Sequence, residues 1–230
     1  ALNFNTSMQA GRENKYKAII FDWDGTLVDS TARIVDAMQM AISENIMPAL
    51  TDHAIQQIIG LGLPEALKVL WPDITDAQSL QMQKCYVANF SYHSKVGVGF
   101  FAQAHEIFEQ LKRLGYVLAV ATGKTRRGLD EMLDGMDVQN VFDITRCADE
   151  TASKPNPKML QEILSELNIT HQQALMVGDT SFDLDMAKNI NMDSIGMTHG
   201  AHESKLLTAS GAKALCHDLN DLLDWIKKNG

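Results

Sequence analysis

The sequence predicts an α/β protein built on a doubly wound parallel sheet, with an all-helical block inserted near the N-terminus. Three observations indicate this fold class. Short apolar runs stop abruptly in small or polar residues, amphipathic helical patterns lie between the runs, and residues 30–95 carry helical patterning without a convincing strand. With 230 residues, of which 45% are hydrophobic, the chain is long enough to bury a substantial core.

Four of the apolar runs predict strands. Each run is too short for a core helix and lacks strict alternation, which is typical of strands buried on both faces of a parallel sheet. The runs cover residues 17–21, 117–121, 142–145 and 174–177, and the third is the weakest. Sheets of this kind bind ligands at the carboxyl ends of their strands, so the polar residues that end the runs are expected to share one edge.

Helical patterns separate the predicted strands. Apolar residues at three- and four-residue spacing predict a helix over 101–114, which Gly115 ends from the C′ position. Asn156 followed by Pro157 predicts the N-cap and first residue of the next helix, and Ser181 is expected to cap the one after it. The alternation of strand and helix is the pattern of a doubly wound sheet.

The predicted elements divide the chain into an arm, a core and a helical block. Residues 1–14 are polar and are expected to form a loose arm. The core is expected to combine residues 15–29 with 96–230, and residues 30–95 form the block. Because the block begins directly after the first strand, it is expected to stand over the strand edge like a lid.

Composition excludes several classes of protein. The net charge of −9 and pI of about 5.2 leave no basic stripe of the kind that binds nucleic acid. No apolar run approaches the roughly 18 residues of a membrane helix, so no membrane partner is expected. Cys85, Cys147 and Cys216 form no CxxC pair and are expected to be reduced packing residues, with the cytosol as the default compartment. Nothing decides between a monomer and a homodimer.

Two carboxylates follow the first strand at a spacing of two residues. Asp22 and Asp24 are separated by Trp23, which is expected to pack beneath the loop. One acid can attack an electrophile while the other handles a proton, and together they can hold a hard cation such as Mg²⁺.

Four motifs in order resemble those of the haloacid dehalogenase (HAD) superfamily. They are Asp22-Trp23-Asp24-Gly25-Thr26, Thr122-Gly123, Lys154-Pro155 and Gly178-Asp179-Thr180-Ser181-Phe182-Asp183. The resemblance runs from about residue 17 to residue 225, and the inserted block resembles the helical (C1) cap of the phosphoglycolate phosphatase and β-phosphoglucomutase branch. It implies a Rossmann-like HAD core and a Mg²⁺-dependent phosphatase. Its substrate would be a small phosphorylated metabolite, with phosphoglycolate the first guess, and the reaction would pass through an aspartyl-phosphate.

The resemblance implies a role for each acid. Asp22 is the expected nucleophile, and Asp24 the expected general acid that later activates water. An acid at position 24 distinguishes phosphoryl transfer from dehalogenation, since a halide leaves without a proton. Mg²⁺ would be held by Asp22, Asp179, Asp183 and the backbone carbonyl of Asp24. Asp183 has an alternative reading as a first-turn acid that favours the helix dipole.

Other motif residues are expected to bind the phosphoryl group. Thr122 and Lys154 offer a hydroxyl and an ammonium, while Gly25 and Gly123 allow backbone N–H groups to approach closely. Gly60 lies where related phosphatases carry a loop that meets substrate, but it is equally well read as a helix break.

Two groups of charged residues remain open. Lys124, Arg126 and Arg127 form a basic cluster that either contacts substrate or is solvated. His199 and His202 follow the last predicted strand, and a surface or capping role is the commoner one for such histidines.

Three alternatives to a phosphatase are retained. A phosphomutase would use the same core residues, although the stretch 58–64 lacks the basic residues that such mutases carry there. A phospho-accepting receiver module is about half this length and accepts phosphate at its third strand. A silent scaffold would not need all of the motif acids.

Overall fold

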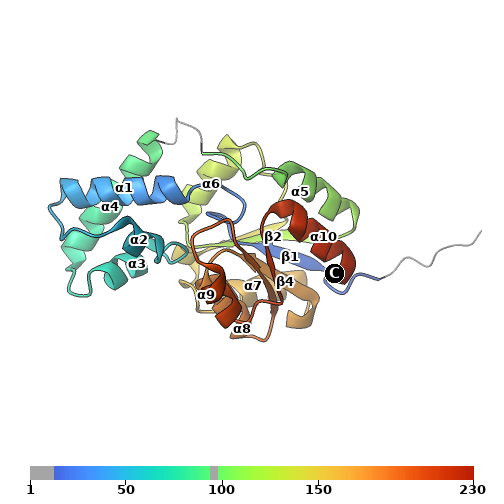
Figure 1. Cartoon of the computed structure of the whole chain (residues 1–230). Helices are drawn as coiled ribbons and strands as arrows, with labels where there is room; N and C mark the ends of the chain where they lie inside the picture. Colours follow the sequence, from blue (N-terminus) through green and yellow to red (C-terminus); the bar gives the residue numbers. More distant parts are fainter. Residues whose placement is uncertain (1–12, 94–97) are drawn as a thin grey trace, which may run out of the picture.

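A computed structural model describes residues 13–93 and 98–230 (Figure 1). In this part of the chain one parallel sheet has the strand order β3-β2-β1-β4-β5-β6. The strands are β1 (Ala18–Phe21), β2 (Val117–Thr122), β3 (Ile144–Cys147), β4 (Ala174–Gly178), β5 (Asp193–Met197) and β6 (Ala214–Cys216). Successive strands are added first on one side of β1 and then on the other, which confirms the doubly wound sheet.

The four predicted strands are present, and two further strands were missed. The third begins at Ile144 rather than at residue 142. Asp143 lies just before it and makes two hydrogen bonds with β2: its N–H donates to the Leu118 carbonyl, and its side chain accepts from the Leu118 N–H. Strand β5 contains polar residues and a glycine, and β6 has only 3 residues. Neither carries a long apolar run, so both depend on pairing with the strand beside them.

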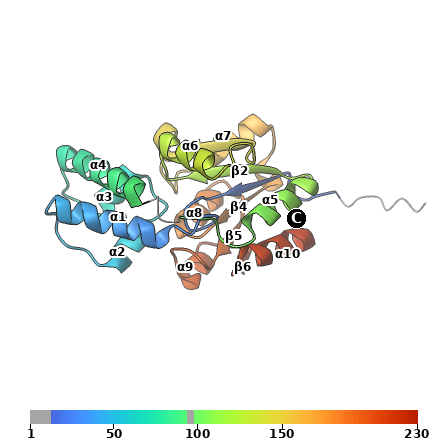
Figure 2. The same ribbon diagram turned by 90° about the horizontal axis from the view of Figure 1, so that it is seen from above.

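Helices cover both faces of the sheet (Figures 1 and 2). Ile19 and Phe21 of β1 pack toward one face, whereas Ala18 and Ile20 pack toward the other. The first face is covered by α5 (Ala104–Arg113), α6 (Arg126–Gly135) and α10 (Leu219–Asn229). The second is covered by α7 (Lys158–Leu167) and α8 (Ser181–Lys188), with α9 (Ser204–Ala209) beside α8. Two short 3₁₀ turns, η1 (Ala148–Glu150) and η2 (His171–Gln173), precede α7 and β4.

The predicted helix ends are right at one position and shifted at three, since the helix predicted over 101–114 begins only at Ala104. Gly115 follows the C-cap of α5, as expected. The prediction that Ser181 caps α8 was wrong, because Thr180 is the N-cap and its side chain accepts from the N–H of Asp183. Helix α7 begins at Lys158, one residue later than predicted, and the Asn156 side chain accepts from the Lys158 N–H at 3.0 Å.

The helical block consists of α1 (Thr31–Glu44), α2 (Asp52–Gln56), α3 (Leu63–Leu70) and α4 (Asp76–His93). Its own apolar cluster centres on buried side chains such as Met38, Leu67 and Met82. Val28, before the block, and Phe100, after it, pair in an isolated antiparallel bridge outside the sheet. The two connections therefore run side by side, and the block lies beyond one end of the sheet (Figure 2).

Other predictions concern single residues. Trp23 is fully buried, as expected, with edge-to-face contacts to Phe100 and Phe142. The cysteines are free, and Cys147 and Cys216 are buried while Cys85 is half-buried.

Most of the expected arm, residues 1–12, lies outside the described residues, as does part of the segment that joins the block to the core. No helix of the described chain has the length and apolarity needed to cross a membrane.

Candidate active site

The predicted site residues meet at the carboxyl edge of the three central strands. Asp22 directly follows β1, Thr122 ends β2 and Asp179 directly follows β4. Since β1 lies between β2 and β4, the three side chains are brought together by strand pairing alone. All three are buried.

Lys154 joins this edge from the loop that follows η1. Its side chain is buried, and its Nζ lies 2.8 Å from Oδ1 of Asp22 and 2.6 Å from Oδ1 of Asp183. Burial by itself lowers the pKa of Lys154, but the carboxylates of Asp183 and Asp22 raise it above its ordinary value. Lys154 is therefore a fixed ammonium rather than a proton donor.

Asp22, Asp179 and Asp183 form an acidic cluster in which one carboxylate oxygen of each residue lies within 4.8 Å of the other two. Burial, followed by the negative charge of Asp183, raises the pKa of Asp22 and raises that of Asp179 to about 6. Oδ2 of Asp22 accepts no hydrogen bond from the residues that the structure describes. A buried set of oxygen donors with one unpartnered carboxylate oxygen fits a hard divalent cation, which would relieve the repulsion between the acids.

Asp179 is held by two hydrogen bonds that the sequence did not indicate. Oδ1 accepts from the Thr26 hydroxyl at 2.9 Å, and Oδ2 accepts from the Ala201 N–H at 2.8 Å. Gly25, at a φ of +77°, passes so close that a Cβ there would collide with the Asp179 carboxylate. The glycine of the first motif therefore makes room for the acid of the last.

Asp183 both caps a helix and lies in the acidic cluster. Its Oδ2 accepts from the backbone N–H and the hydroxyl of Thr180, at 3.1 and 2.9 Å, and so caps α8. Its Oδ1 faces Lys154 in the acidic cluster. Capping fixes the rotamer that presents the second oxygen to the site.

Asp24 lies at the edge of the site and is the more exposed of the first two acids. Its Oδ1 accepts from the Ser30 hydroxyl at 2.7 Å, and its Oδ2 lies 3.4 Å from Nζ of Lys124. The Lys124 ammonium also lies 4.6 Å above the ring of Phe90 in the helical block. Lys124 therefore enters the site, where the sequence left its role open.

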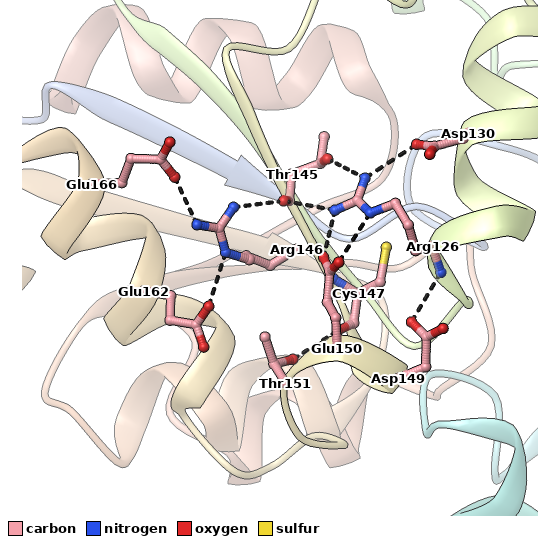
Figure 3. A network of polar contacts seen from close by, with 10 residues as sticks. All are labelled: Arg126, Asp130, Thr145, Arg146, Cys147, Asp149, Glu150, Thr151, Glu162 and Glu166. Atoms are coloured by element: carbon pink, nitrogen blue, oxygen red, sulfur yellow. Dashed lines mark hydrogen bonds and ion pairs between the residues drawn. The ribbon is translucent and has the colours of Figure 1, made fainter.

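The other two residues of the basic cluster pair with acids outside the acidic cluster, although Arg127 also borders the cavity described below. Arg126 bonds Glu150, Asp130 and Thr145, and Arg127 is exposed and pairs with Glu131 on the next turn. Figure 3 shows Arg126 in a network that ties the start of α6 to β3 and η1.

The same network continues to α7 through Arg146. This guanidinium bonds Glu162 at 3.1 Å and Glu166 at 2.7 Å (Figure 3). Because β3, η1 and α7 flank the loop of Lys154, the network holds the loop from both sides. Burial raises the pKa of the enclosed Cys147 to about 12, so its thiol is unreactive.

The remaining phosphate-site candidates lie where the helical block meets the core. The Thr122 hydroxyl accepts from the Lys124 N–H at 3.1 Å. A Cβ on Gly123 would lie 2.6 Å from the carbonyl oxygen of Gly60 and 2.7 Å from that of Leu61. Gly60 thus both interrupts the helices α2 and α3 and brings its loop against the core.

Polar contacts hold the block against the core. The Gly62 N–H donates to Oγ of Ser153 at 2.9 Å, and the Gln56 amide donates to the Ala201 carbonyl at 2.8 Å. His202 bridges both parts, since its Nε2 donates to the Gln57 carbonyl at 2.9 Å.

The two open histidines have positioning contacts. Nδ1 of His202 accepts from the Ser181 N–H at 3.0 Å, at the start of α8. His199 stacks on Phe101 with centroids 3.7 Å apart and donates from Nε2 to the Thr26 carbonyl at 2.9 Å. Burial lowers the pKa of His199, which favours its neutral form. Sequence reasoning had no signal for Ser153, Gln56 or Ala201, because their contacts join segments far apart in the chain.

A cavity of 510 Å³ lies between the helical block and α6. Asp22, Asp24 and Thr122 border it from the core, together with Gly123 and Lys124. The site therefore opens into a cavity that both the core and the helical block line.

The family profile of haloacid dehalogenase-like hydrolases matches residues 19–197. The chain belongs to this family of hydrolases. It is 33% identical over 210 residues to "Probable phosphatase IndB" of Dickeya dadantii, covering 89% of this chain and 91% of that protein. It is 24% identical to a phosphoglycolate phosphatase of Colwellia psychrerythraea, covering 92% and 97% of the two chains. Among solved structures, a hydrolase from Pseudomonas syringae has a TM-score of 0.85 at 24% identity, covering 93% of this chain and 98% of that one, which supports the fold.

Proposed function

We propose that this hydrolase is a Mg²⁺-dependent phosphatase that acts on a small phosphorylated metabolite through an aspartyl-phosphate. The observation that carries the proposal is the buried arrangement of Asp22, Asp179 and Asp183 around the Lys154 ammonium. Family membership and relatives named as phosphatases support it. Phosphoglycolate, named for one of those relatives, is the first ester to test.

Asp22 and Asp24 divide the chemistry between them. An Asp22 oxygen forms a bond to phosphorus while the ester P–O bond breaks, and the departing oxygen takes a proton from Asp24. Asp24 then removes a proton from water, which attacks phosphorus and releases inorganic phosphate from Asp22. The Ser30 hydroxyl and the Lys124 ammonium position the Asp24 side chain, which enters the first step as the carboxylic acid and the second as the carboxylate.

Fixed positive charge and hydrogen-bond donors stabilise the phosphoryl group. Lys154 and the Thr122 hydroxyl are aimed at its oxygens, and Gly25 and Gly123 let backbone N–H groups approach. The acidic cluster and the Asp24 carbonyl would hold Mg²⁺. When bound, the ion neutralises the repulsion between the anionic nucleophile and the anionic substrate.

The helical block acts in this proposal as a lid on the core. Residues 30–95 form the lid, and residues 15–29 and 96–230 form the catalytic core. The contacts of Gly62 with Ser153 and of His202 with Gln57 describe its closed position. Closure keeps bulk water from the phosphoryl group during the first transfer.

The test is phosphate release from a panel of small phosphate esters, measured with Mg²⁺ and with EDTA. Asp22→Asn is expected to lower turnover by at least about 10³-fold while the fold is retained, since it removes the nucleophile. Asp185→Asn, which changes an acid on α8 outside the acidic cluster, is the matched control and should keep full activity. Residual activity above a few percent in Asp22→Asn would remove Asp22 from its role.

If no ester releases phosphate, assays for sugar-phosphate isomerisation and for a persistent phospho-aspartate separate the alternatives. A phosphomutase would isomerise a sugar phosphate, a receiver module would hold a long-lived phospho-aspartate, and a scaffold would do neither. The absence of nucleic-acid and membrane partners, the cytosolic location and the oligomeric state stay predictions or open points.

A further inference from the structure

We infer that the cavity selects phosphate monoesters with an uncharged, largely apolar leaving group, in preference to short anionic esters such as phosphoglycolate. The inference rests on the proposed function and concerns the part of the substrate beyond the phosphoryl group. Its basis is the size of the cavity, the chemistry of its wall and the pairing of its charges.

The cavity is large for a substrate with a two-carbon leaving group. Its 510 Å³ falls within the range of roughly 300–1,000 Å³ that is typical of pockets for drug-sized ligands. Besides Asp22, Asp24 and Thr122, its lining includes residues of α1, α4 and α6, so the cavity extends beyond the reacting atoms.

The wall facing the catalytic edge is apolar, and we call it the apolar wall. Helix α1 contributes Ile34 and Met38, and helix α4 contributes Tyr86, Val87 and Phe90. The rings of Tyr86 and Phe90 lie 6.0 Å apart and are inclined by only 30°, which offers an extended aromatic surface. Ile59 and Leu61, from the loop that meets the core, complete this wall.

The charges on the cavity lining are already paired. Lys124 is matched to Asp24, and Arg127 is exposed and matched to Glu131. Of the residues described, these are the basic side chains that border the cavity, and neither is unpartnered. A substrate carboxylate placed here would lose water without gaining an unpaired cation, which is unfavourable against an apolar surface.

Tyr86 adds a neutral donor to the wall. Burial and the nearby carboxylate of Asp24 raise the pKa of this phenol, so it stays protonated. On an otherwise apolar wall, this single hydroxyl can donate to one hydroxyl or carbonyl of an otherwise apolar leaving group.

The test is kcat/KM for the n-alkyl phosphates from ethyl to hexyl, compared with phosphoglycolate. Their alcohols leave with nearly the same pKa, so the series varies apolar contact while the chemistry stays constant. We expect kcat/KM to rise with each methylene, by up to about fourfold where burial is complete. Phosphoglycolate is expected to fall at least about tenfold below hexyl phosphate. A flat series with phosphoglycolate preferred would overturn the inference.

A pair of variants on one helix sharpens the test. Val87→Arg places an unpaired cation on the apolar wall at a residue that is 51% exposed, so the fold should tolerate it. It is expected to lower the ratio of kcat/KM for hexyl phosphate to that for phosphoglycolate by at least about tenfold. Leu80→Arg, also exposed on α4 but outside the cavity lining, is the matched control and should leave the ratio unchanged. Equal effects of the two variants would contradict a role for the wall.

Binding measurements distinguish a failure of this inference from a failure of the proposed function. Calorimetry with non-hydrolysable alkylphosphonates and Mg²⁺ should give tighter binding for hexylphosphonate than for ethylphosphonate or phosphonoacetate. If this order holds but no ester is hydrolysed, the pocket chemistry stands and the proposed phosphatase falls. If turnover is lost in Asp22→Asn but the affinity for alkylphosphonates does not depend on chain length, the phosphatase proposal is supported and the inference about the cavity is refuted.

Discussion

The two sides of the cavity are built on different principles. On the core side, nearly every functional side chain is buried and fixed by a named partner, as Asp179 is by Thr26 and Ala201. On the block side, Met38, Val87 and Phe90 line the cavity with apolar side chains, which offer no hydrogen-bond donors or acceptors. Under our two proposals, the core carries out the reaction and the block selects the leaving group.

Substituting Lys154 should give the largest effect on the core side. Lys154→Met leaves Asp22 and Asp183 buried without their cation, which costs about 3–5 kcal/mol in comparable buried pairs. Turnover should fall by a similar factor for every ester, since the phosphoryl group is common to all. Urea denaturation without metal and kinetics on two esters measure both effects. If the loss differed tenfold between esters, the division between core and block would fail.

Adding and removing Mg²⁺ should give the next largest effect. The ion is expected to raise the melting temperature by relieving repulsion in the acidic cluster, and saturation at about 100 times Kd corresponds to about 2.7 kcal/mol. EDTA should reverse the shift, which differential scanning calorimetry records. Asp179→Asn should abolish it, whereas Asp149→Asn, on η1 away from the cluster, should not.

A methyl group at Gly25 tests the close approach on the core side. The left-handed backbone alone penalises Gly25→Ala by about 1–2 kcal/mol, and the collision displaces the Asp179 carboxylate. Stability and Mg²⁺ affinity should therefore fall together, as measured by thermal unfolding and metal titration. Gly135→Ala, where no atom lies within 4 Å of the added Cβ, should be neutral or stabilising. A fully stable Gly25→Ala with native metal affinity would refute the steric argument.

The smallest expected effect concerns the network that supports the loop of Lys154. The Arg126 side chain, by hydrogen bonding, holds the pKa of Glu150 below its usual value of 4.5, so the pair stabilises the fold above that pH. The contribution is lost as pH falls below 4.5 through the lowered pKa of the folded state. Glu150→Gln should thus reduce stability at pH 7 by less than about 1 kcal/mol, because the pair is partly screened, and the deficit should vanish in acid.

The control for this pH experiment is Glu131→Gln. Glu131 pairs with Arg127 at an exposed i, i+4 position, so its replacement should leave stability nearly unchanged at either pH. Chemical denaturation at pH 7 and below pH 4 compares the two variants. A Glu150→Gln deficit that persisted unchanged in acid would show that the carboxylate charge is not its cause.

The fold class and the position of the acids were predictable because their signals are local. Asp22, Thr122 and Asp179 each follow or end a short apolar run, and parallel pairing then brings them together. The N-cap at Ser181 was wrong because Thr180 and Ser181 are both capable caps, and only the contact with Asp183 decides between them. Strand β6 was missed because its pairing with β5, rather than its own sequence, makes it a strand.

By itself, the sequence determined the doubly wound sheet, the inserted helices and the motif residues that lie at the strand ends. The tertiary structure decided the partners: of three neighbouring cations, Lys124 enters the site, Arg126 supports the loop of Lys154 and Arg127 stays on the surface. It also decided the apolar wall, which combines α1, α4 and the loop beside Gly60. The physical reason is that charge pairing and cavity shape depend on contacts between residues far apart in the chain. Strand burial and helix periodicity, in contrast, are determined by the pattern of consecutive residues.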